Sequence, residues 1–181
     1  MDPVSQFKTL LEQATVALSP EYFQLLVAGS DLPVYRERLY CYELYHQLRS
    51  LWPEGFPWSL GGEIDKSGHP IFRGSRLDHL KPDFLVHRPG NMDSNLIVIE
   101  VKPIVARVPD VIEALGSLNA FRDVAGYSLP ILLVFGGDLP DLIALKDRTM
   151  AALHDKPEVE PGRIELWWHA HPAEPASRIP W

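Results

Sequence analysis

Leu96-Ile97-Val98-Ile99-Glu100-Val101-Lys102 decides the fold, because four consecutive apolar residues are followed at once by two charged ones. An apolar run of this kind is typical of a strand that is buried on both faces of a sheet. Side chains alternate along a strand, so Glu100 and Lys102 point to one side and Val101 to the other. Buried charges are costly unless they are paired. The stretch therefore predicts a central strand whose end holds a carboxylate and an ammonium group together.

A second strand is predicted just upstream, from Asp83 to His87, where Pro82 stands at a position that strands tolerate. The turn-rich segment 88–95 makes the two strands neighbours. If they pair, Asp83 and Glu100 can share a hard divalent cation, because Mg²⁺ prefers oxygen ligands. Such a cation would hold a phosphodiester and lower the pKa of an attacking water, while Lys102 would orient that water or neutralise charge in the transition state.

The rest of the chain alternates helices with strands. Apolar spacing predicts helices over about 6–18, 35–51, 110–122 and 139–153, a short helix after Ser19, and further strands over 58–64, 129–135 and 163–169. This order predicts an α/β fold, with a mixed central sheet covered by helices on both sides. We expect one domain over 1–181, packing helices in about 1–33, and a peripheral tail over about 172–181.

The composition is that of a soluble globular protein, with 46% hydrophobic and 23% charged residues. A single cysteine, Cys41, excludes an internal disulfide, and neither a secretory signal nor a membrane-spanning run is evident, so we expect a cytoplasmic protein. The net charge of -7 argues against binding nucleic acid by bulk electrostatics. Segment 71–107 nevertheless holds six basic residues against four acidic ones, whereas 108–160 holds four against nine. Tight DNA binding is therefore expected to need a homodimer or a protein partner.

Glu37 lies on the apolar face of the helix predicted after Pro33. At ~100° per residue, Glu37 falls within a stripe of apolar side chains, whereas Glu43 lies at the edge of that stripe. The stripe consists of Tyr40, Cys41, Leu44, Leu48 and Leu51. An inward carboxylate needs a partner, which a metal site with Lys102 nearby would supply; the alternative is a capping or surface residue in the first helical turn. Cys41, within the stripe, is interpreted as a core residue and not as a nucleophile.

Pro82-Asp83, sixteen residues, and then Glu100-Val101-Lys102 on an apolar strand resemble the motif of the PD-(D/E)XK nuclease superfamily. The stretch from Tyr35 to Phe121 is similar to small bacterial restriction endonuclease-like members, in which an early helix carries a Glu-Arg pair and a later strand carries a glutamate. Glu37-Arg38 and Glu63 match these features. The resemblance implies a restriction endonuclease-like αβββαβ core and a metal-dependent endonuclease that hydrolyses DNA.

The resemblance also implies roles for individual residues. The implied catalytic residues are Asp83, Glu100, Lys102 and Glu37. The implied metal set, for Mg²⁺ or Mn²⁺, is Asp83, Glu100, Glu63 and Val101, and Asp65 could take the place of Glu63. The implied substrate-binding cations are Arg38, Lys81, Arg73 and Arg76. The lysine or glutamine that relatives carry on the next helix has no obvious match among Glu113, Ser117, Asn119 and Arg122. Restriction or defence against foreign DNA is the implied setting.

Other interpretations are weaker. A second hypothesis is a nuclease-like binding or assembly subunit of a defence complex with little catalysis of its own. A two-carboxylate glycosidase leaves the lysine beside the acid unexplained. His169 and His171 share a face of the last predicted strand, but an edge strand with polar ends is favoured over a metal pair, because no third ligand is near in sequence.

Overall fold

A six-stranded mixed sheet forms the centre of the computed structural model, which describes residues 2–29, 31–63, 77–78, 80–90 and 94–181. The strands lie in chain order: β3 (Ser59–Gly62), β4 (Phe84–His87), β5 (Asn95–Pro103), β6 (Leu129–Phe135), β7 (Glu165–His169) and β8 (Ser177–Ile179). β5, β6 and β7 are parallel, and the other neighbours are antiparallel. The predicted pairing of β4 with β5 is confirmed, with Phe84 opposite Ile99.

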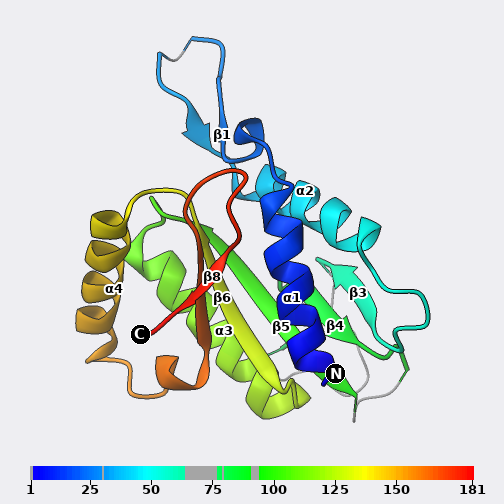
Figure 1. The fold of residues 1–181 in the computed structure, drawn as a ribbon. Coiled ribbons are helices and arrows are strands. Elements are labelled where there is room, and N and C mark those ends of the chain that lie inside the picture. The colour runs from blue at the N-terminus through cyan, green and yellow to red at the C-terminus, as the bar shows by residue number, and fades with distance from the viewer. Residues whose placement is uncertain (1, 30, 64–76, 79, 91–93) are drawn as a thin grey trace.

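Helices cover both faces of this sheet, as predicted (Figure 1). The bounds are α1 (Pro3–Val16), α2 (Glu37–Ser50), α3 (Val108–Ala125) and α4 (Leu139–Leu153). Residues of α1 and α2 share one buried cluster with Ile99 and Val101 of β5. Residues of α3 and α4 share a second cluster with Val98 of the same strand. The alternation expected along β5 is thus observed, and Glu100 lies on the side that faces α3.

Local sequence explains most element bounds. Strand β6 and helix α4 begin and end where predicted; α4 begins with a capping box in which Asp138 and Asp141 accept from each other's backbone N–H. Helix α3 extends further than predicted, from Val108 to Ala125, because Pro109 is tolerated in its first turn and Gly126 ends it in the left-handed conformation. The short helix after Ser19 is one 3-10 turn, η1 (Pro20–Tyr22).

A two-stranded arm projects from the end of the molecule where α2 begins (Figure 1). It consists of β1 (Gln24–Leu25) and β2 (Val34–Tyr35), so the first 33 residues contain strand structure in addition to the packing helix. Tyr35 packs edge-on against Phe135. Its ring also occupies the space that a Cβ atom at Gly136 would need, and Gly136 has a φ of 81° that favours glycine. The arm is therefore anchored to the end of β6.

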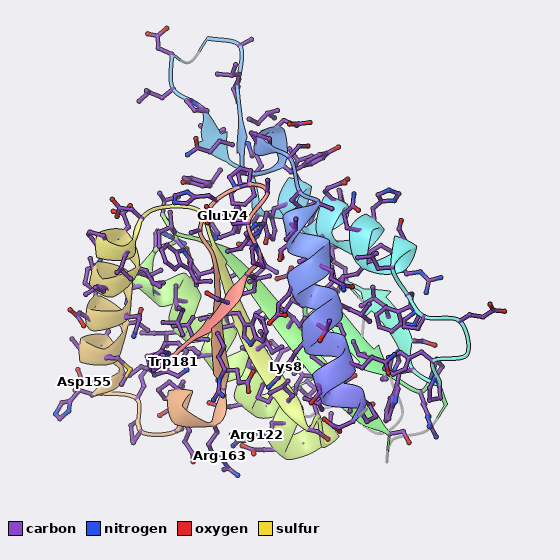
Figure 2. The ribbon with its side chains drawn as sticks, in the orientation of Figure 1. Lys8, Arg122, Asp155, Arg163, Glu174 and Trp181 are labelled. Carbon is purple, nitrogen blue, oxygen red and sulfur yellow. The ribbon has the colours of Figure 1, made fainter. Side chains whose placement is uncertain are left out.

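The C-terminal tail adds β8 to the sheet and is tied down at both sides of it. The backbone N–H of Ala176 donates to Thr15 Oγ1 (2.8 Å), and Trp181 Nε1 donates to the carbonyl oxygen of Ile164 (2.7 Å) (Figure 2). The sequence predicts only a peripheral segment here. The pairing of β8 with β7 is not evident from the sequence, because the segment is rich in proline and a short edge strand is defined only by the strand it pairs with.

β8 makes β7 an interior strand, so the edge strand predicted for His169 is wrong. His169 is fully buried, its Nδ1 lies 2.7 Å from Tyr40 Oη, and Phe23 packs edge-on against its ring. His171 is exposed.

The remaining element is a second 3-10 turn, η2 (Pro161–Arg163), at the end of the molecule away from the arm. Lys8 of α1 forms an ion pair with Glu165 of β7 (2.7 Å), which ties the helix to the sheet (Figure 2). None of the described helices has the length and apolar character needed to cross a membrane.

Candidate active site

Asp83 directly precedes β4 and Glu100 lies within β5, side by side where the pairing of β4 with β5 ends. Phe84 pairs with Ile99, so the preceding residue, Asp83, stands at the level of Glu100. Asp83 Oδ2 accepts a hydrogen bond from the backbone N–H of Val101 (2.7 Å). This hydrogen bond fixes the Asp83 carboxylate next to the last residue pair between β4 and β5.

Burial raises the pKa of both carboxyl groups. Glu100 is only 9% exposed, and burial together with the charge of Asp83 raises its pKa to about 8. Ser117 of α3 donates from Oγ to Glu100 Oε1 (2.8 Å) and partly offsets the shift. Burial raises the pKa of Asp83 to about 6, against the lowering effect of the Val101 N–H. Two carboxylates held this close in a desolvated place favour a bound proton or cation.

Lys102 is held by Glu37, whose inward orientation the helix geometry predicts. Lys102 Nζ lies 2.9 Å from Glu37 Oε1, although the two residues are far apart in sequence. Burial opposes the charge of Lys102, but the hydrogen bond and the neighbouring carboxylates raise its pKa on balance, so it stays a cation. Glu37 is the first residue of α2 and is partly exposed, so the inward orientation and the first-turn position are both observed.

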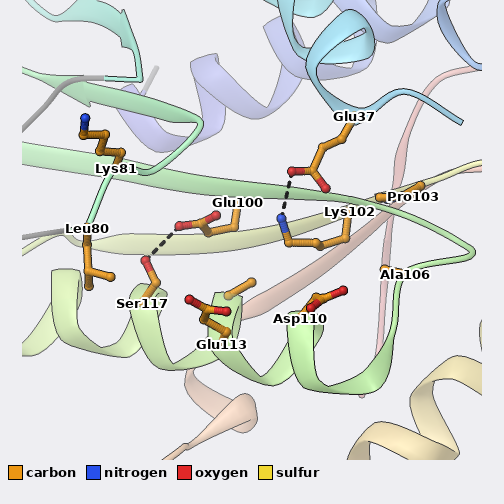
Figure 3. Close-up of a pocket in the computed structure, with 11 residues that line it drawn as sticks. Glu37, Leu80, Lys81, Glu100, Lys102, Pro103, Ala106, Asp110, Glu113 and Ser117 are labelled. Atoms are coloured by element: carbon orange, nitrogen blue, oxygen red, sulfur yellow. Dashed lines mark hydrogen bonds and ion pairs between the residues drawn. The ribbon is translucent and has the colours of Figure 1, made fainter.

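A cavity of about 560 Å³ opens beside these residues, between the end of β5 and the first half of α3 (Figure 3). It is lined by Glu37, Leu80, Lys81, Glu100, Lys102, Pro103, Ala106, Asp110, Glu113, Ala114 and Ser117. The lining holds four acidic residues and two lysines, and one of the acids, Asp110, is paired with Arg107 outside the lining. Because the pKa of Glu100 is raised to about 8 and Asp110 is matched by Arg107, the charges of the lining nearly balance at neutral pH.

Asp83 and several other predicted site residues lie outside this cavity lining. Glu63 follows β3 with a φ of 43°, its N–H donates to the carbonyl oxygen of Asp83 (3.1 Å), and its carboxylate pairs with Arg38 (3.3 Å) at the surface. The Val101 side chain is buried on the opposite face and its N–H is bonded to Asp83, so only its carbonyl oxygen is left for a ligand. Arg73, Arg76 and Asp65 lie outside the described residues.

The donor set around Asp83 and Glu100 suits a hard cation. Within the described ranges, no three His, Cys, Asp or Glu side chains are arranged to hold a metal ion. Mg²⁺, however, is usually held by one or two carboxylates, with waters and substrate phosphates supplying the other ligands. Two desolvated carboxylates with raised pKa values fit that pattern.

The hydrogen bond from Ser117 to Glu100 was not predicted from the sequence. Of the four candidates on this helix, Glu113 and Ser117 line the cavity, whereas Asn119 bonds the backbone of Glu160 (2.8 Å) at the other end. Most of α3 is buried, so its apolar pattern does not single out the face that meets β5. The sequence offers one indication, a serine four residues after Glu113 on the same helical face. Burial raises the pKa of Cys41, consistent with a core residue.

Comparisons with known proteins identify no relative, because no family model matches the sequence and searches of curated proteins and of solved structures gave no match.

Proposed function

We propose that this protein is a metal-dependent endonuclease of the PD-(D/E)XK type that hydrolyses phosphodiester bonds in DNA. The observation that carries the proposal is the pair of desolvated carboxylates, Asp83 and Glu100, at adjacent strand ends with the Lys102 ammonium group on the same strand. Carboxylates whose pKa values are raised by burial and by neighbouring carboxylates are typical of functional sites. A structural ion pair alone would need only one acid for Lys102.

The order of elements supports the same proposal. Helix α2 is followed by β3, β4 and β5, then by α3 and β6, which is the αβββαβ order that the sequence motif implies. The two acids stand at the end of the central antiparallel pair, and the helix before the sheet supplies Glu37. Motif, order of elements and side-chain geometry therefore agree, although each alone would be weak support.

Each residue has a role in the proposed chemistry. Asp83 and Glu100 would hold Mg²⁺ or Mn²⁺, with the carbonyl oxygen of Val101 and Glu63 as further candidates. The cation supplies charge stabilisation at the phosphate and a water of lowered pKa. Lys102, kept charged by Glu37, would orient the attacking water or neutralise charge on the phosphate oxygens. Ser117 would hold the Glu100 carboxylate in one orientation by donating to it.

A second candidate function is a nuclease-like subunit that assembles with a partner in a defence complex. The net charge of -7 favours it, because it repels a phosphate backbone when no cation is bound. The complete set of Asp83, Glu100 and Lys102 favours the enzyme.

The decisive experiment is cleavage of supercoiled plasmid and of a labelled single strand by the purified protein, with Mg²⁺, Mn²⁺ or EDTA. Lys102→Ala serves as the inactive variant, and Lys146→Ala on α4 removes the same charge far from the cavity. We expect cleavage that needs the metal, persists in Lys146→Ala and disappears in Lys102→Ala. A folded protein that cleaves neither substrate and takes up no metal in calorimetry would overturn the enzymatic proposal and leave the assembly subunit.

A further inference from the structure

Helix α2 presents a basic and aromatic face to solvent, which we call the α2 ridge and define as Arg38, Tyr42, His46 and Arg49. These four side chains are exposed, Tyr42 to 59% and the Arg38 side chain to 71%. At ~100° per residue they fall within about 80° of one another, away from the buried stripe. With a rise of 1.5 Å per residue, the ridge is about 16 Å long.

The two acidic residues of α2 lie outside the ridge. Glu37 is engaged with Lys102 in the cavity. Glu43 lies on the other flank of the helix and accepts from Gln47 Nε2 (2.6 Å). The ridge therefore carries two arginines: Arg38 is paired with Glu63 at its start, and Arg49 forms no ion pair with the described residues.

Two arginines at the opposite end of the molecule, Arg122 and Arg163, serve for comparison because each is paired with an acidic residue (Figure 2). Arg122 lies 2.7 Å from Asp123, and Arg163 lies 3.1 Å from Glu160, so both charges are matched. Among the residues that the structure describes, none forms an ion pair with Arg49, and no ring packs on Tyr42. The ridge thus keeps its cation and its aromatic ring available.

The ridge starts beside the candidate active site. Arg38 directly follows Glu37, and its partner Glu63 is bonded through its backbone to Asp83. Helix α2 is held against β3 and β4 because the ring of Tyr45 stacks on Phe84 of β4 and lies over Gly62 of β3. These contacts link the first residue of the ridge, through Glu63, to Asp83 of the candidate site.

We infer that the α2 ridge binds an unpaired nucleic acid strand and guides it to the cavity, an inference that rests on the proposed function. Arginines attract the phosphates, and the exposed Tyr42 ring offers a stacking platform of the kind that sequence-tolerant single-strand binders use. In a duplex the base faces are stacked on each other, so an isolated aromatic ring gains little there. The substrate class is accordingly a single strand or an unpaired region of DNA.

The experiment measures binding apart from cleavage. A fluorescent oligothymidylate and a hairpin duplex of equal length are titrated in EDTA, with polarisation as the readout. Tyr42→Ala should weaken binding of the single strand about tenfold. Arg49→Gln should weaken it and reduce the slope of log affinity against log salt by about 0.7. Tyr42→Phe should keep binding, and Arg148→Gln, the same change on an exposed position of α4, should leave it unaltered.

The outcomes separate this inference from the proposed function. If the folded Tyr42→Ala and Arg49→Gln proteins bind the single strand as well as the wild type, or if the duplex binds more tightly, the ridge inference is wrong even when metal-dependent cleavage is found. If both variants lose binding but the wild type cleaves nothing with any metal, the ridge stands and the nuclease proposal falls. Circular dichroism of each variant guards against loss of folding.

Discussion

Two buried polar residues, Glu100 on β5 and His169 on β7, flank the same strand β6 and yet have opposite environments. His169 has a neutral partner, Tyr40, among aromatic rings, and burial lowers its pKa to about 4. Glu100 has the hydroxyl of Ser117 and the like charge of Asp83, and its pKa is raised to about 8. The histidine is thus uncharged at neutral pH, whereas the glutamate keeps its proton to a far higher pH than an exposed carboxyl group does.

This difference separates polar groups that stabilise the fold from polar groups that the fold must tolerate. A matched neutral pair contributes a hydrogen bond and takes no part in chemistry near neutral pH. A crowded pair of acids destabilises the protein when both ionise, and is retained where a ligand relieves the repulsion. Four predictions test the contrast, beginning with the largest effect.

Asp83→Asn should reduce metal-dependent cleavage roughly a thousandfold or more, because it removes one of two carboxylates that would hold the cation. Tyr40→Phe, at the other buried group, should retain cleavage within about threefold, since no reacting atom is expected there. Initial rates on plasmid at saturating Mg²⁺ measure both. Equal losses in the two variants would contradict the division of roles.

Glu100→Gln should stabilise the metal-free protein at pH 8 by on the order of 2 kcal/mol. The pKa of Glu100 rises from 4.5 to about 8 on folding, so the folded state binds more protons between these values and loses stability as the pH rises through them. The gain should vanish at pH 4, where the carboxyl is protonated in both states. Urea denaturation in EDTA at the two pH values measures it, and a variant less stable than the wild type at pH 8 would refute it.

Tyr40→Phe should destabilise the protein by about 1–2 kcal/mol, because it leaves the buried Nδ1 of His169 without its partner. Tyr22→Phe, which removes a hydroxyl from a residue that is not buried, is the matched control. Urea denaturation at pH 7 compares them. No difference between the two would mean that the Tyr40–His169 bond contributes nothing to stability.

Ser117→Ala should reduce cleavage about threefold to tenfold at pH 7, the scale of a lost hydrogen bond to a charged group. Without the donor the pKa of Glu100 rises, so the rate profile should shift to higher pH and converge with the wild type once the carboxyl is ionised in both. Ser128→Ala, at the far end of the sheet, is the control. A uniform loss at every pH would indicate a merely structural serine.

Local sequence patterns allowed the sheet and its helices to be predicted, but not the contacts between distant segments that complete the site and the sheet. The apolar run of β6 and the capping residues of α4 lie within their own segments, so their bounds were predictable. Asp83, Glu100 and Lys102 stand next to strand ends that the sequence marks, so their proximity was predictable too. The bond from Ser117 depends on the rotation of a helix buried on nearly all sides, and the position of His169 inside the sheet depends on a tail ten residues away. Neither the Ser117 hydrogen bond nor the interior position of His169 can be predicted from a local sequence pattern.

Gly136 links the arm to the candidate site in a way that bears on how this protein can change by mutation. Any side chain at this position would collide with the ring of Tyr35, which is two residues before the first residue of α2. The first turn of that helix carries Glu37, which holds Lys102. A methyl group added at Gly136, directly after β6, would therefore displace Tyr35 and with it the first turn of α2. Substitutions at Gly136, which takes no part in the proposed chemistry, should be as poorly tolerated as substitutions in the cavity.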